Sequence, residues 1–157
     1  MILALIPSRL KSKRLNKKPL LEIDGLPIII HTLKRVLLSK KVNKAIVCTD
    51  SSIIKKVVEN HGGEAILTSV KPRNGTERIA EVATKYKKAK LIIDVQGDEP
   101  LVDPNDIDKV ITFHKKFFNF DIVLPIKETK NSDDKSLIKL VFLNKKIIYF
   151  SRSQIPY

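Results

Sequence analysis

The chain has 157 residues, of which 43% are hydrophobic and 30% charged, a composition typical of one folded globular domain. Its apolar runs are short and interrupted by lysine, so no membrane-spanning helix or secretory signal is predicted, and a single cysteine, Cys48, excludes an internal disulfide and fits a reducing cytoplasm. The net charge of +13 suggests nucleic-acid binding, but 24 of the 30 cations are Lys, and most of these lie on the polar faces of predicted helices, so a generally Lys-rich composition is the better explanation.

Short apolar runs alternate with amphipathic stretches as far as Asn119, which is typical of an α/β fold with a mostly parallel sheet. Strands are predicted over residues 2–6, 45–48, 65–67 and 91–95. Helices are predicted over residues 28–38, 53–58, 76–86 and 104–118, the last starting at the Asp103-Pro104 pair. After Asn119 three strands are predicted, over residues 122–126, 137–143 and 147–150, so the α/β pattern gives way to an antiparallel extension.

Three polar segments follow or face the predicted strand ends, where open parallel sheets bind their ligands. The first, residues 7–19, places cations after the first strand, namely Arg9, Lys11, Lys13, Arg14, Lys17 and Lys18. Cations with exposed backbone N–H groups suit a triphosphate, although the glycines of a Walker loop are missing. Taken alone, the segment is explained equally well as a solvated basic loop.

The second segment, residues 73–78, leads into a predicted helix. Asn74 or Thr76 can cap that helix, Gly75 lets backbone approach a ligand, and Arg78 can fork onto a base edge or a phosphate. Ordinary capping with a surface Glu77–Arg78 pair is the favoured explanation if the segment stands alone.

The third segment, residues 96–100, has the sequence Gln-Gly-Asp-Glu-Pro after the strand at 91–95. A rigid carboxylate such as Asp98 at a strand end suits Mg²⁺, and a turn without a ligand is the alternative. Strand alternation is expected to point Asp94 away from Asp98, and Asp50 is expected to cap the helix that follows it. Cys48 is predicted to be a core residue, and the histidines lack zinc spacing.

Together these segments resemble one enzyme family, the 3-deoxy-manno-octulosonate (Kdo) cytidylyltransferases or CMP-Kdo synthetases. The matching motifs occur in family order at residues 6–9 with 14–15 and 18–20, at 75–78, at 96–100, and at 150–152 with 155–157. Sialic-acid-activating relatives typically carry a Gln-Pro-Thr-Ser-Pro type of segment in place of Gln-Gly-Asp-Glu-Pro, which favours Kdo. The resemblance implies a Rossmann-like nucleotide-diphospho-sugar transferase fold, with helices on both faces of the sheet, truncated before its C-terminal part.

In this family the anomeric hydroxyl of Kdo attacks the α-phosphate of CTP, giving CMP-Kdo and pyrophosphate for lipopolysaccharide biosynthesis. The resemblance implies that Lys18 and Asp98 are catalytic and that Asp98 holds the cofactor Mg²⁺. Sugar contacts are implied for Gln96 and Arg152. The nucleotide-binding residues that it implies are Arg9, Ser12, Arg14, Lys18, Gly75, Arg78 and Asp98. CTP and Kdo are the expected partners, and neither a nucleic acid nor a membrane is expected.

The resemblance also divides the chain into a nucleotide-binding α/β core, residues 1–126, and an incomplete antiparallel extension and dimerisation region, residues 127–157. Family members continue beyond Tyr157 with a second metal-binding Asp, further Kdo contacts and much of the dimer surface. A homodimer is therefore expected for the full-length protein, and this chain alone is expected to bind CTP weakly and turn over poorly. Lys17 replaces a glycine that is common in the family's basic loop, which leaves that loop's phosphate contacts open.

Two alternatives remain open from the sequence. One is a sibling cytidylyltransferase for 8-amino-Kdo or another keto-acid sugar. The other is a natural truncation kept as a non-catalytic nucleotide-binding module.

Overall fold

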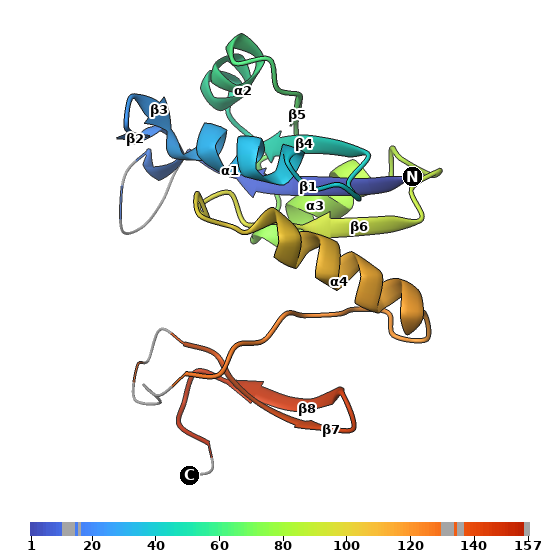
Figure 1. Ribbon diagram of the computed structural model, residues 1–157. Coiled ribbons are helices and arrows are strands. Elements are labelled where there is room, and N and C mark those ends of the chain that lie inside the picture. Colours follow the sequence, from blue (N-terminus) through green and yellow to red (C-terminus); the bar gives the residue numbers. More distant parts are fainter. Residues whose placement is uncertain (11–14, 16, 130–133, 135–136, 156–157) are drawn as a thin grey trace. The chain divides into compact units, whose positions relative to one another are not determined.

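The computed structural model describes residues 1–157 except 11–14, 16, 130–133, 135–136 and 156–157 (Figure 1). Its internal contacts divide the chain into two units, Met1–Val123 and Leu124–Tyr157, which are described separately. Two of the expected nucleotide-binding residues, Ser12 and Arg14, lie outside the described residues, as does the end of the last motif.

A parallel sheet forms the centre of the first unit. Its strands are β1 (Ile2–Ser8), β4 (Lys44–Thr49), β5 (Ala65–Leu67) and β6 (Leu91–Asp94), in the order β5-β4-β1-β6. Every pairing in this sheet is parallel, and every residue of the central strand β1 is buried. The predicted parallel α/β core is confirmed, and parallel pairing brings the carboxyl ends of all four strands to one edge.

Helices cover both faces of this sheet (Figure 1). They are α1 (Ile28–Leu37), α2 (Ser52–Asn60), α3 (Gly75–Ala83) and α4 (Pro104–Lys116). Alternate β1 side chains, such as Ala4 and Ile6, join a core cluster with buried residues of α1, α2 and α4. Leu3 and Leu5 face the other way and cluster with Ile79 and Val82 of α3. The period of two in β1 thus divides the core into two layers.

Three of the four helices begin with a side-chain cap. Asn74 accepts from the Glu77 backbone N–H at 2.8 Å, and Asp103 caps α4 ahead of Pro104, as the sequence predicts. The prediction that Asp50 caps α2 is wrong, because Ser51 occupies the N-cap and its Oγ accepts from the Ile54 backbone N–H. The carboxylate of Asp50 is consequently available for another partner.

Between β1 and α1 the described chain forms a single turn of 3₁₀ helix, Lys18–Leu20, and a short hairpin of β2 (Glu22–Ile23) and β3 (Leu26–Pro27). Across the described part of the chain, no helix has the length and hydropathy needed to cross a bilayer.

The second unit contains an antiparallel hairpin of β7 (Lys139–Leu143) and β8 (Lys146–Ser151). Asn144 and Lys145 both have positive φ, as the tight turn of such a hairpin requires. The strand predicted over residues 122–126 is wrong, since no strand in the described residues pairs with this segment. Its apolar side chains Ile122, Leu124 and Ile126 are exposed, so their hydrophobicity alone does not make a strand.

Candidate functional site

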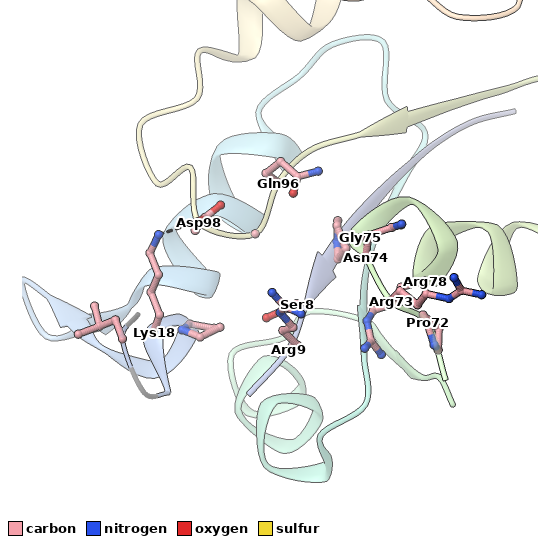
Figure 2. Close-up of a pocket in the computed structure, with 14 residues that line it drawn as sticks. Ser8, Arg9, Lys18, Pro72, Arg73, Asn74, Gly75, Arg78, Gln96 and Asp98 are labelled. Carbon is pink, nitrogen blue, oxygen red and sulfur yellow. Dashed lines mark hydrogen bonds and ion pairs between the residues drawn. The ribbon is translucent and has the colours of Figure 1, made fainter. Parts of the chain in front are cut away.

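A pocket of about 570 Å³ opens at the carboxyl edge of the sheet (Figure 2). All three polar segments that the sequence singles out line it. The first contributes Pro7, Ser8, Arg9, Leu15, Lys18 and Pro19, the second Arg73, Asn74, Gly75 and Arg78, and the third Gln96, Gly97 and Asp98; Pro72, just before the second segment, also lines the pocket. Arg9, Lys18, Gly75, Arg78, Gln96 and Asp98 therefore share one cavity, although Lys18 and Asp98, for example, are 80 residues apart along the chain.

Two glycines let these segments converge on Pro7. A Cβ atom on Gly97 would lie 2.6 Å from the Pro7 carbonyl oxygen, and one on Gly75 would lie 3.0 Å from the Pro7 Cγ. The first contact is with rigid backbone, so no larger residue fits at Gly97 without moving the end of β1 or the turn after β6. The Thr32 hydroxyl also donates to the Gly97 carbonyl oxygen, which ties this turn to α1.

Lys18 and Asp98 form an ion pair at the mouth of the pocket. The Lys18 Nζ donates to the Asp98 Oδ2 at 2.6 Å, and the two side chains are 37% and 48% exposed (Figure 2). An exposed pair of this kind contributes little to stability, because solvent screens its charges. Both groups are accessible to a ligand in the pocket.

The chemistry of Asp98 fits a bound Mg²⁺ ion. Among the residues that the structure describes, no cluster of three or more His, Cys, Asp or Glu side chains forms a complete metal cage. Mg²⁺ is commonly held by one or two carboxylates together with water and substrate phosphate oxygens, and one accessible carboxylate beside cations is consistent with that arrangement.

Arg78 is buried on the opposite side of the pocket, with 3% of its surface exposed. Its Nη2 donates to the Asp50 Oδ2 at 2.7 Å, and its Nη1 donates to the Thr68 hydroxyl and the Ser69 carbonyl oxygen. The guanidinium thus joins the ends of β4 and β5 to α3. The surface Glu77–Arg78 pair considered from the sequence is not formed, because Glu77 instead accepts from the Arg73 backbone N–H.

The loop between β5 and α3 is fixed by two further carboxylates. Glu81 accepts from both the backbone N–H and the hydroxyl of Ser69, at 2.8 and 2.9 Å. These bonds stabilise the charged carboxylate and lower the pKa of Glu81. Glu77 accepts from the Arg73 backbone N–H at 2.9 Å. The stretch that contributes Pro72 and Arg73 to the pocket is therefore fixed without any ligand.

Sequence reasoning did not include Ser8 among the site residues. Ser8 ends β1, is 6% exposed and lines the pocket, yet its buried hydroxyl has no hydrogen-bond partner among the described residues. A buried polar group without a protein partner is uncommon, and either a water molecule or a ligand in the pocket can complete its hydrogen bond. The sequence carries no sign of this, because a missing partner is a property of the three-dimensional surroundings.

Asp94, the last residue of β6, accepts at 2.9 Å through Oδ1 from the Gln96 Nε2. Asp94 is exposed as a residue, but partial desolvation of its carboxylate raises its pKa; the Gln96 bond opposes this rise, and the neighbouring Glu99 charge adds to it. β6 ends at Asp94, and this bond places the Asp94 carboxylate beside Gln96.

Lys17 has a φ of 55°, in the left-handed region. Glycine adopts this conformation without steric cost, whereas a residue with a Cβ is strained there. The backbone of this chain therefore keeps the conformation that a glycine favours, although a lysine occupies the position.

Two other predicted residues have clear surroundings. Cys48 is fully buried in the core, as predicted, and burial raises the pKa of its thiol to about 12. Arg152 follows β8 in the second unit, where its carbonyl oxygen accepts from the Lys139 Nζ at 3.1 Å. Its role in sugar binding stays a prediction.

A parallel sheet with cations and a carboxylate at its carboxyl edge is the arrangement of a nucleotide-binding α/β protein. The sequence model of the cytidylyltransferase family matches residues 3–157, and the chain belongs to that family. This membership and the observed fold confirm the resemblance found in the motifs.

Individual relatives are similar over almost the whole chain. The 8-amino-3,8-dideoxy-manno-octulosonate cytidylyltransferase of Shewanella woodyi is 38% identical over 98% of this chain and 65% of its own length. The 3-deoxy-manno-octulosonate cytidylyltransferase of Chlorobium limicola is 40% identical over 98% of this chain and 64% of its own. A solved CMP:2-keto-3-deoxy-manno-octonic acid synthetase complexed with CTP superposes with a TM-score of 0.87 at 34% identity, over 99% of this chain and 66% of that one. The chain thus spans about 65% of the length of these curated relatives.

Proposed function

We propose that this protein activates Kdo by transferring the cytidylyl group of CTP to it, with release of pyrophosphate. The observation that carries the proposal is the convergence of Arg9, Lys18 and Asp98 on one pocket at the carboxyl edge of the sheet. The relatives named for this reaction, and the solved synthetase complexed with CTP, support the choice of substrates.

In the proposed reaction the anomeric hydroxyl oxygen of Kdo bonds to the α-phosphorus of CTP. The bond from that phosphorus to the bridging oxygen breaks, pyrophosphate leaves, and the hydroxyl proton is released. Enzymes accelerate such transfers mainly by positioning the reactants and neutralising charge on the phosphates. Arg9 and Lys18 supply positive charge in the pocket, and Asp98 is the residue that would hold Mg²⁺. When bound, that ion supplies further neutralisation of the phosphate oxygens.

The Lys18–Asp98 pair suits a site that exchanges partners. Without nucleotide the two side chains neutralise each other at 2.6 Å. A triphosphate offers Lys18 stronger partners, and Asp98 is then released to serve as a metal ligand. Because both side chains are substantially exposed, this exchange has a small energetic cost.

The remaining assignments belong to the same proposal. Gly75 lets backbone approach the nucleotide, and Arg78 acts on nucleotide binding through the loop that it braces. Gln96 and Arg152 contact the sugar, and Arg152 pairs with the Kdo carboxylate. We place residues 1–126 in the nucleotide-binding core and residues 127–157 in an extension that contributes to a homodimer of the full-length protein. A cytoplasmic location follows from the use of CTP.

A second candidate substrate is 8-amino-Kdo. The Shewanella woodyi relative, named for that sugar, is 38% identical to this chain, against 40% for the Chlorobium limicola relative named for Kdo. Two identities this close do not separate the two sugars.

The test measures CTP binding by calorimetry and pyrophosphate release with Kdo or 8-amino-Kdo, each with and without Mg²⁺. We expect CTP to bind more tightly with Mg²⁺, and Lys18→Ala to reduce kcat/KM by about 100-fold because a charge-neutralising group is lost. Asp98→Asn is expected to remove the effect of Mg²⁺ on CTP binding. Lys109→Ala is the matched control, because Lys109 forms an exposed pair with Asp106 on α4. Unchanged CTP binding and turnover in Lys18→Ala would contradict the proposal.

A further inference from the structure

Asp94 and Gln96 lie two residues apart at the end of β6, and side chains two apart on an extended chain share one side. Val95, between them, is buried on the other side. The Gln96 side chain is therefore held from one direction by Asp94 and lines the pocket from the other.

This contact determines which end of the Gln96 amide faces the pocket. The oxygen and nitrogen ends of an amide have nearly the same shape, so their hydrogen-bond partners decide the orientation. An ionised carboxylate only accepts, so the amide must turn its Nε2 toward Asp94. Its Oε1 then points toward Gly75, 3.6 Å from the position that a Cβ atom on Gly75 would take (Figure 2).

We propose that Asp94 is a positioning residue that fixes Gln96 with its carbonyl oxygen toward the pocket, so that this wall selects a ligand group that donates a hydrogen bond. The inference rests on the proposed function, which offers two sources of such a donor. One is the exocyclic amino group of cytosine, which uracil replaces with a carbonyl oxygen. The other is a hydroxyl or ammonium group of the sugar.

Other contacts hold the backbone of this turn. The Glu99 backbone N–H donates to the Gln96 carbonyl oxygen at 3.2 Å, and the Thr32 hydroxyl donates to the Gly97 carbonyl oxygen at 3.3 Å. The Asp94 side chain is exposed as well. Replacing Asp94 therefore releases the Gln96 amide while the turn stays in place.

The experiment titrates CTP and UTP separately into the wild-type protein and into Asp94→Ala and Asp94→Asn, and measures KM for Kdo in the same variants. In Asp94→Ala the amide turns freely. With the donor on cytosine we expect the ratio of CTP to UTP affinity to fall about fivefold, the value of one ordinary hydrogen bond, and with the donor on the sugar we expect KM for Kdo to rise by about the same factor instead. Asp94→Asn keeps an acceptor for the Gln96 Nε2 and is expected to restore most of the ratio. Glu99→Gln removes the same charge beside the turn and is expected to leave the ratio unchanged.

Each outcome separates the two hypotheses. If wild-type protein does not bind CTP, the proposed function fails. Two outcomes would contradict the positioning role of Asp94 in a protein that binds CTP. In one, Asp94→Ala lowers the affinities for CTP and UTP equally; in the other, it changes neither affinity and leaves KM for Kdo unchanged. If only KM for Kdo rises in Asp94→Ala and Asp94→Asn restores it, the inference holds with the donor on the sugar.

Discussion

The two sides of the pocket are built differently. We call residues 68–78, which run from the end of β5 into α3, the α3 wall. There Arg78 is 3% exposed and bonded to Asp50 and Thr68, while Glu81 and Glu77 hold the loop backbone. On the other side stands the Lys18–Asp98 pair, a single contact between side chains that are 37% and 48% exposed.

This difference indicates that the two sides of the pocket have different roles in ligand binding. Several internal hydrogen bonds hold the α3 wall, so its shape is largely set before a ligand arrives and little ordering remains to be done on binding. Lys18 and Asp98 keep charges that can change partners at small cost. Recognition by shape therefore belongs to the α3 wall, and charge neutralisation belongs to the Lys18–Asp98 pair.

The largest effect is expected from breaking the α3 wall at Arg78. Arg78→Ala leaves the Asp50 carboxylate without its cation, and removing one partner of a buried pair costs about 3 kcal/mol of unfolding free energy. Urea denaturation followed by circular dichroism measures this loss, and calorimetry measures CTP affinity at a temperature where the variant is folded. We expect both stability and affinity to fall.

Lys18→Ala is the counterpart on the other side. It is expected to lower CTP affinity while changing the unfolding free energy by less than about 0.5 kcal/mol, since an exposed pair contributes little. If Lys18→Ala destabilises the protein as much as Arg78→Ala does, the distinction between the α3 wall and the Lys18–Asp98 pair is wrong.

A smaller loss of stability is expected from a change at Gly97, in the turn between β6 and Asp98. Gly97→Ala places a Cβ 2.6 Å from the Pro7 carbonyl oxygen, so the turn that carries Asp98 must shift. Overpacking of this kind typically costs about 2 kcal/mol. We expect reduced thermal stability and weaker Mg²⁺-dependent CTP binding, because the displaced turn carries Asp98 away from Lys18.

Gly75→Ala is the matched control, because its new Cβ meets the Pro7 ring at 3.0 Å rather than a backbone oxygen. A ring can move by a few tenths of an ångström, so a smaller loss of stability is expected. Equal losses in the two variants would show that backbone contact at Gly97 is not what fixes this turn.

Much of the α/β core is predictable from the sequence because burial follows the period of each element. The alternation in β1 and the helical spacing of Ile54 and Val58 report directly which side chains face the core. The pocket is predictable for a related reason, since the carboxyl ends of parallel strands meet at one edge. The segments around Arg9, Gly75 and Asp98 therefore had to approach one another.

The partners within the pocket were not predictable. Asp50 and Arg78 are 28 residues apart, and nothing in either local sequence says that Ser51 rather than Asp50 caps α2. The segment 122–126 has a strand-like composition but no described partner strand, and pairing is a property of the fold rather than of the segment. Side-chain pairing depends on three-dimensional approach, which periodicity does not encode.

The smallest expected effect, at Ser8, has an unusual sign. The Ser8 hydroxyl is buried without a partner among the described residues, and a hydroxyl that stays unpaired in the free protein costs about 1 kcal/mol or more. Ser8→Ala removes this unsatisfied group, so the unfolding free energy is expected to stay constant or rise by about 1 kcal/mol, whereas CTP affinity is expected to fall if the ligand completes the missing bond.

Ser51→Ala is the control with the opposite sign, because it removes a hydroxyl that caps α2 and is expected to lose about 1 kcal/mol of unfolding free energy. Urea denaturation and CTP titration of both variants make the measurement. If Ser8→Ala is stabilised and binds CTP more weakly, Ser8 resembles Lys18 and Asp98 in interacting with the ligand. If the variant is destabilised and its CTP binding is unchanged, Ser8 has a structural role, like the residues of the α3 wall.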